Sequence, residues 1–306
     1  MWLLYAFSGP LLWAISTHID KFLVDKYFRH SDTAVLMVFT AFLGVIALPV
    51  IWLFEPEVLA LPWLATGVMT ASGILYMGAM LFYLRAIQTE EASVVAPLFQ
   101  ATTLFTFALG LVFLHEMPRW PQLLGAGLVV AGALGLSLDK KLHLHSFKLR
   151  LVLLMLAATF AVALSSVVFK FFAVHDEFWS TTFWTFVGEG LFGVGILLRP
   201  KYRKQFVHLF RKNPGAVIGV NAANELINLG GGLGVRYASL LAPVALVSAI
   251  SATSTFFVFL FAILLTVFFP KFGREDLSAR NVYQKAVGGL LIMAGVAMMQ
   301  AFGGGR

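Results

Sequence analysis

A hydrophobic unit occurs twice in this chain, and each copy contains an odd number of segments long enough to cross a bilayer. Gly-punctuated apolar stretches of that length occur about ten times in the 306 residues. Residues 10–45 align with 159–194, so that Lys21 falls on Lys170, and further along Arg85 falls on Arg236. An odd-numbered unit repeated in one chain must insert the second time upside down. The sequence therefore predicts an all-α polytopic membrane protein, with ten transmembrane helices arranged as two inverted five-helix repeats, as in secondary transporters.

The repeats set the expected boundaries. Residues 1–138 form the first five-helix unit, 139–150 the connecting loop and 151–306 the second unit. Later in the units Gly125 and Gly132 fall on Gly288 and Gly295, after one insertion near 269–271. The expected spans are about 2–19, 33–54, 61–84, 92–114, 121–138, 151–172, 178–198, 214–235, 239–268 and 282–302.

Composition agrees with the membrane class. Hydrophobic residues make up 59% of the chain and charged residues 12%, whereas a soluble domain carries about 25% charged residues. The absence of cysteine excludes disulfides and thiol chemistry. The formal charge of +7 lies in short loops between spans, so we expect a lipid bilayer as partner and no nucleic acid. The first segment has no basic start, so we expect a retained helix rather than a signal peptide.

The distribution of basic residues predicts the orientation. Of the 22 Lys and Arg, 18 fall on the side of the odd-numbered loops. The positive-inside rule places that side in the cytoplasm. We therefore expect a multi-pass protein of the inner (plasma) membrane with both termini outside the cytoplasm.

Three stretches near the end of the first repeat follow a known pattern. They are 91–98, with an Ala-Ser start and a Pro; 114–117, with a His-Glu turn; and 122–127, with Gln-x-x-Gly and a later Ala-Gly. The second repeat keeps the last element at 284–288 and Ala294-Gly295. The pattern resembles the drug/metabolite transporter superfamily, specifically its EamA-type branch. The resemblance implies a solute exporter or exchanger with a central cavity between the halves. Two departures are Thr266-Val267-Phe268 in place of the second His-Glu turn, and the termini outside.

The eighth span carries the strongest candidate site. Asn221, Asn224, Glu225 and Asn228 occur at i, i+3, i+4 and i+7, which places them on one helix face. Three glycines at 230–232 follow, and we expect them to break the helix at a midplane site. A buried charge costs about 2.5–3.5 kcal/mol on insertion scales, so Glu225 needs a reason to be there. Inter-helix packing suffices for Asn221 alone, whereas Glu225 with its neighbours favours substrate binding.

The seventh span contains a second carboxylate, Glu189, on one stripe with Thr182, Thr185 and Gly193. Both interpretations, substrate binding and helix packing, stay open for Glu189. A carboxylate in a wet membrane cavity can exchange a proton, so proton coupling is an open alternative.

The basic residues Lys21 and Lys170 are related by the repeat, and inversion places them near opposite mouths of one pathway. They either guide an anionic substrate, pairing with Asp20 or Glu189 during the cycle, or act as interfacial anchors. The same two interpretations apply to Arg85 and Arg236, for which the anchor is favoured. Further candidates are Gln100, which the repeat relates to Ser251, and two aromatic residues, Trp13 and Tyr76. No metal site or cofactor is expected.

The function that these features favour is secondary active transport of a small organic solute or metabolite by alternating access. An alternative on the same fold is a translocator of a phosphorylated or lipid-linked anion, motivated by the paired lysines. An intramembrane enzyme is disfavoured because no nucleophile–base pair or HExxH motif occurs at usable spacing. A channel would conduct without saturation or counterflow. Glycine faces on the fifth and tenth spans suit close packing within or between chains, so monomer and homodimer stay open.

Overall fold

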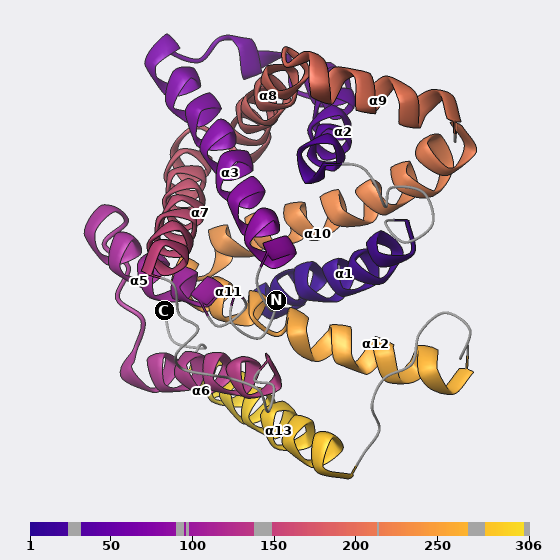
Figure 1. Cartoon of the computed structure of the whole chain (residues 1–306). Coiled ribbons are helices and arrows are strands. Elements are labelled where there is room, and N and C mark those ends of the chain that lie inside the picture. Colours follow the sequence, from indigo (N-terminus) through magenta and orange to yellow (C-terminus); the bar gives the residue numbers. More distant parts are fainter. Residues whose placement is uncertain are drawn as a thin grey trace.

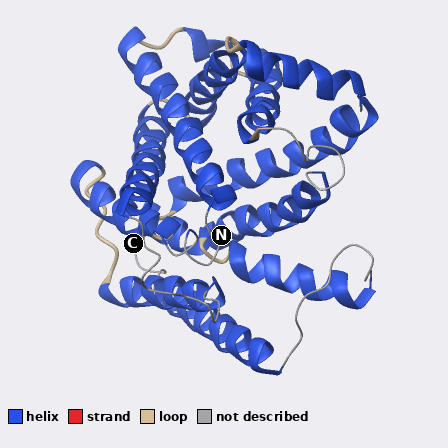
Figure 2. Cartoon of the chain, viewed as in Figure 1, coloured by secondary structure: helices blue, strands red, loops and turns tan. Residues whose placement is uncertain are grey.

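The computed structural model describes residues 1–23, 32–89, 95, 98–137, 149–212, 214–268 and 279–302. Within these ranges the regular structure is entirely helical (Figure 2). Three features expected from the sequence lie outside the described residues: most of the 91–98 motif, most of the connecting loop and the insertion at 269–271.

Within its described residues, the first half of the chain contains four long helices, a short 3-10 turn and one shorter helix. These are α1 (Trp2–Leu23), α2 (Thr33–Phe54), η2 (Pro56–Leu59), α3 (Trp63–Thr89), α5 (Ala101–Phe113) and α6 (Trp120–Ser137). Asp32 caps α2, accepting a hydrogen bond from the backbone N–H of Ala34 at 3.0 Å.

The described elements of the second half run from α7 to α13. They are α7 (Leu149–His175), α8 (Phe178–Leu197), α9 (Pro200–Lys212), η4 (Ala216–Asn221), α10 (Ala222–Leu241), α11 (Val244–Ser251), α12 (Ser254–Phe268) and α13 (Ala279–Ala301). The helix α9 was not expected. It turns 101° away from α8 and runs across the end of α2 (Figure 1).

The apolar helices support a multi-pass membrane protein. Among the described residues, four segments are long and apolar enough to cross a membrane: α2, α3, α7 and the pair α11–α12 taken together. The bent pair α8–α9 makes a fifth if it counts as one span. The all-helical prediction is confirmed for the described part, whereas the count of ten spans as inverted repeats is not confirmed.

The glycine run at 230–232 does not break α10, and this prediction is wrong. The helix continues through it to Leu241, while the irregular π-helical turn η4 precedes the Asn and Glu residues instead. Glycine is used here for close approach: a Cβ on Gly231 would lie 3.0 Å from Trp13 Nε1 and 3.3 Å from the carbonyl oxygen of Gly9. The run therefore lets α10 pack directly on α1.

The helices α6 and α13 form a separate close pair at one edge of the molecule (Figure 1). A Cβ on Gly125 would lie 2.6 Å from the carbonyl oxygen of Gly295, and one on Gly132 would lie 2.5 Å from that of Gly288. Each of these glycines thus permits backbone-to-backbone contact at the crossing, as expected from the sequence.

Candidate functional site

Polar side chains from three helices gather where α1, α2 and α10 meet. Asn224 Nδ2 donates to Asp20 Oδ1 at 2.6 Å, which joins α10 to α1. Thr40 Oγ1 donates to Glu225 Oε1 at 3.0 Å, which joins α2 to α10. Asn228 Nδ2 lies 3.5 Å from Glu225 Oε2. We call Ser16, Asp20, Thr40, Asn224, Glu225 and Asn228 the carboxylate cluster.

The carboxylate cluster has three properties of a binding site rather than of packing alone. Glu225 and Asn224 are 8% and 1% exposed, yet Asn224 Oδ1 has no hydrogen-bond partner within the described structure. Neither Asp20 nor Glu225 forms an ion pair with a basic side chain among the described residues. Asp20 is exposed, so its carboxylate is not closed off by the described helices. Two carboxylates without a positive partner favour a ligand that is cationic or rich in hydrogen-bond donors.

Trp13, another of the candidates, contacts this region from α1. Its indole Nε1 donates to the backbone carbonyl of Asn228 at 3.4 Å. Asn221 is buried at the junction of η4 and α10, one turn before Glu225. The structure thus brings five of the ten predicted site residues into one region: Trp13, Asn221, Asn224, Glu225 and Asn228.

A second polar contact lies further along α10. Arg236 donates to Glu189 Oε1 of α8 at 2.6 Å, and both side chains are largely buried. The guanidinium also lies over the rings of Phe169 and Phe186, at 5.2 and 5.1 Å from their centroids. The interpretation of Arg236 as an interfacial anchor is therefore wrong, because its charge is neutralised inside the protein. The eleven positions between Glu225 and Arg236 separate the two contacts by about 16 Å along the helix.

Lys170 has a different partner from those expected. It pairs with Glu116, at the end of the α5–α6 connection, and not with Asp20 or Glu189. Its ammonium also donates to the carbonyl oxygen of Ala242 at 2.6 Å. Glu116 Oε2 in turn accepts from the backbone N–H of Val244 at 2.8 Å, which satisfies the first turn of α11. One ion pair therefore holds α7, the α5–α6 connection and the break before α11 together.

The remaining candidates are not members of the carboxylate cluster. Lys21 is exposed in the last turn of α1. Gln100 lies half-buried at the start of α5, where its carbonyl accepts from the N–H of Thr103. Tyr76 packs among apolar side chains of α2, α3 and α7. Arg85 forms a contact of 3.8 Å with Asp32, and at 41% exposure it keeps the surface position expected of it.

Five residues of these contacts were not among the site candidates: Ser16, Asp20, Thr40, Glu116 and Arg236. The sequence indicated Asp20 as a partner of the lysines, Arg236 as an anchor in preference to a guide for an anion, and Glu116 as part of a motif. A signal existed for Asp20, because an acidic residue near a span needs a partner. Thr40 gave no signal in the sequence, because a single Thr in a helix usually bonds its own backbone.

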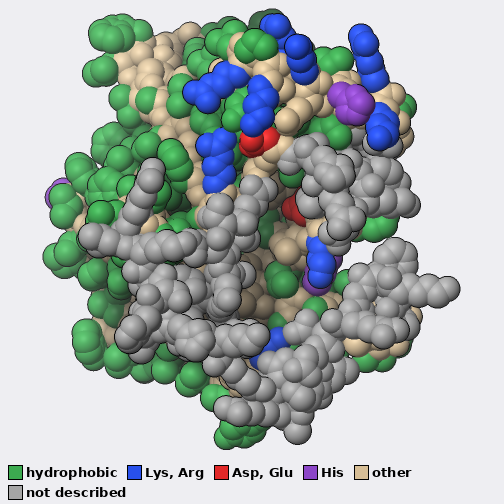
Figure 3. Space-filling view, viewed as in Figure 1, with side chains coloured by type: hydrophobic (Ala, Val, Ile, Leu, Met, Phe, Trp, Pro, Cys, Tyr) green, Lys and Arg blue, Asp and Glu red, His purple; other side chains and the backbone are tan. Residues whose placement is uncertain are grey.

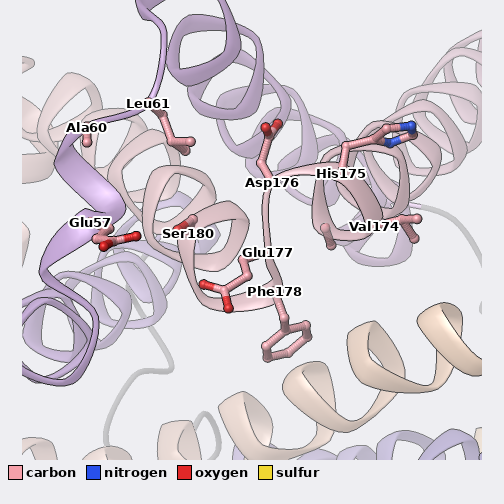
Figure 4. Close-up of a pocket in the computed structure, with 10 residues that line it drawn as sticks. Glu57, Ala60, Leu61, Val174, His175, Asp176, Glu177, Phe178 and Ser180 are labelled. Atoms are coloured by element: carbon pink, nitrogen blue, oxygen red, sulfur yellow. The ribbon is translucent and has the colours of Figure 1, made fainter.

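A pocket of about 450 Å³ opens at a different place, between η2 and the turn that joins α7 to α8. Figure 4 shows Glu57, Asp176 and Glu177 around it, with His175 beside them. None of the predicted site residues lines it. On the face shown in Figure 3, Lys and Arg side chains gather over α9.

Comparison with known proteins agrees with the motifs. The model of the EamA-like transporter family matches residues 1–138. These residues belong to that family. The EamA-type resemblance is thereby confirmed, and EamA-like proteins are transporters rather than enzymes. No curated protein gives a significant match.

The fold is also found among solved structures. One of them, described only as "Crystal structure of protein", is 19% identical and superposes with a TM-score of 0.62. The match covers 96% of this chain and 94% of that one. At this identity the likeness concerns the fold alone, and it extends the agreement beyond the EamA-like segment.

Proposed function

We propose that this EamA-like protein is a secondary active transporter that moves a small organic solute by alternating access, with the carboxylate cluster as its binding site. The observation that carries the proposal is the presence of two carboxylates, Asp20 and Glu225, on the packed helices α1 and α10, with no ion-paired basic side chain among the described residues. Such a site holds a solute with a positive charge or several hydrogen-bond donors. A proton on one carboxylate would balance the site when it is empty, which keeps proton coupling within the proposal.

The proposal includes two inverted repeats, and the contacts of α6 with α13 support it. The sequence relates Gly125 to Gly288 and Gly132 to Gly295. In the structure Gly125 meets Gly295 and Gly132 meets Gly288. Each glycine thus meets the repeat partner of the other, the reciprocal pattern that a two-fold axis produces. The pairing of α1 with α10, and of α3 with α7, fits the same symmetry.

The alternative cargo, a phosphorylated or lipid-linked anion, has less support. It rested on Lys21 and Lys170 as paired guides for negative charge. Lys170 is already neutralised by Glu116, and Lys21 is an exposed residue of the last turn of α1. An anion near Asp20 and Glu225 would be repelled.

We further propose the inner membrane as location, with both termini outside the cytoplasm and α9 inside. The bias of Lys and Arg toward one side supports this orientation. Fusion of a reporter that is active only in the cytoplasm should give no signal after residue 306 and a signal after residue 212. An active reporter after residue 306 would reverse the orientation.

The transport proposal is tested at Glu225. In proteoliposomes loaded with a panel of metabolites and amines, the wild type should show saturable counterflow of at least one solute. Counterflow by the Glu225→Gln variant should be at least about tenfold slower than that of the wild type. The reason is that one charge-assisted contact is worth about 1.5–3 kcal/mol. Glu57→Gln, an exposed carboxylate of η2, is the matched control.

Both variants must elute as folded protein and give the wild-type melting temperature within a few degrees. Wild-type counterflow in a folded Glu225→Gln variant would remove the carboxylate cluster from the transport pathway. Flux that does not saturate would instead indicate a channel.

A further inference from the structure

Near Asp20, one buried hydrogen-bond acceptor has no partner in the described structure, the side-chain oxygen of Asn224. Asn224 is 1% exposed, and its Nδ2 is fixed by the hydrogen bond of 2.6 Å to Asp20 Oδ1. This bond also fixes which end of the amide is oxygen, since a carboxylate accepts from an N–H. The oxygen, Oδ1, is buried and has no hydrogen-bond partner in the described structure. A buried acceptor that is left unpaired costs about 1–3 kcal/mol, so it points to a missing partner.

The side chains linked to the Asn224 amide, directly or through Asp20, all carry oxygen. Asp20 accepts from the amide nitrogen, Ser16 Oγ lies 3.5 Å from Asp20 Oδ2, and Glu225 adds a second carboxylate on the next position of α10. No Lys or Arg of the described chain pairs with these carboxylates. Carboxylate, amide and hydroxyl oxygens that are not ion-paired with an ammonium are the donor set of a hard cation.

The local backbone suits such a ligand as well. The π-helical turn Ala216–Asn221 ends just before Asn224. Turns of this type disturb the regular i to i+4 bonding and occur frequently at functional sites. In transporters, backbone carbonyls at helix irregularities near the substrate site coordinate coupling ions.

We propose that Asp20, the Asn224 side-chain oxygen and Ser16 form a binding site for one sodium ion, with Glu225 as the second negative charge close by. The described chain has no group of three or more His, Cys, Asp or Glu side chains of the kind that holds a divalent or transition metal. Two carboxylates and neutral oxygens suit a monovalent ion. The exposure of Asp20 leaves its carboxylate accessible to an ion.

This inference rests on the proposed function in one respect: sodium would be the coupling ion for the same carboxylate cluster. Bound Na⁺ would neutralise one of the two carboxylates and leave the other for a cationic group of the solute. The ion and the solute would then favour each other's binding by a coupling free energy.

The test measures ion binding without transport. The melting temperature of the purified full-length protein is recorded in increasing NaCl, with choline chloride replacing it at constant ionic strength, and in parallel with KCl. We expect a saturating rise of several degrees with Na⁺, because a ligand of the folded state stabilises it. An equal rise with K⁺ or choline, or no rise at all, would overturn the sodium site.

Variants localise the effect. Asp20→Asn keeps an acceptor for Asn224 Nδ2 but removes the charge, and Asn224→Ser removes the unpaired oxygen; each should abolish the Na⁺-dependent rise. Each variant is compared with itself in choline, so a lower starting stability does not hide the result. Glu57→Gln should keep the full rise. Retention of the wild-type rise in both cluster variants would place the ion elsewhere and contradict the proposal.

Failure of this inference is distinguishable from failure of the transport proposal. Loss of counterflow in Glu225→Gln without any Na⁺ effect on melting would leave the solute site and remove the sodium site. A Na⁺ effect on melting that depends on Asp20, combined with normal counterflow in Glu225→Gln, would leave the sodium site and remove the solute site.

Discussion

Replacement of Glu116 by Gln should lower the free energy of unfolding by about 3–5 kcal/mol, because it leaves the ammonium of Lys170 as an unpaired charge inside the protein. The Lys170 side chain is only 11% exposed, and its other contact is the neutral carbonyl of Ala242. The amide of Gln can still accept from the N–H of Val244, so the loss reports on the charge rather than on the helix cap. Thermal or denaturant unfolding of the purified protein measures it.

The double variant Glu116→Gln, Lys170→Met is the informative control. With both charges absent, no buried ion remains uncompensated, and the double variant should recover most of the stability that the single variant loses. A double variant as unstable as Glu116→Gln alone would mean that the ion pair is not the source of the loss. A single variant as stable as the wild type would show that Lys170 reaches water.

Replacement of Arg236 by Gln should have an effect of the same order, about 3–5 kcal/mol, since Glu189 would be left as a buried carboxylate without its partner. The side chain of Glu189 is 8% exposed, and the guanidinium also loses its positions over Phe169 and Phe186. Arg236→Lys should fall between, because an ammonium keeps the charge but not the planar stacking.

The matched comparison for Arg236 is Arg203→Gln on the exposed face of α9, which should change stability by less than about 0.5 kcal/mol. Adding Glu189→Gln to Arg236→Gln should restore much of the loss. If Arg236→Gln and Arg203→Gln have the same melting temperature, Arg236 would be a snorkelling anchor.

The class of the protein and the place of its strongest polar face followed from the sequence, because both depend on spacing along a single helix. Glu225 and its Asn neighbours share one face by helical geometry alone. The partners of the charged residues did not follow, because each partner lies on a helix far away in the chain. Lys170 meets Glu116 and Arg236 meets Glu189 only after α5, α7, α8 and α10 have packed. Nothing in the spacing around either residue encodes that choice.

For the glycines too, the sequence predicted the role of some and not of others. Those of α6 and α13 were correctly expected to serve close packing, since small residues recur at helical spacing on one face. Those at 230–232 were expected to break α10, because three adjacent glycines weaken an isolated helix. Packing against α1 outweighs this tendency, as the contact of Gly231 with Trp13 shows. Helix propensity was a poor guide where a neighbouring helix covers the glycines.

Because α9 follows α8 after a sharp bend, a tilt of α8 would move the far end of α9. Glu189 lies near the middle of α8, while α9 extends from its end across α2, where Lys201 meets Asp32 at 3.4 Å. With thirteen residues, α9 is about 20 Å long, so a tilt of α8 by about 10° would displace its far end by about 3 Å. A small change in the contact between Glu189 and Arg236 would thus be enlarged at the far end of α9. The position of the basic end of α9 would then depend on whether the buried contact between Glu189 and Arg236 is formed.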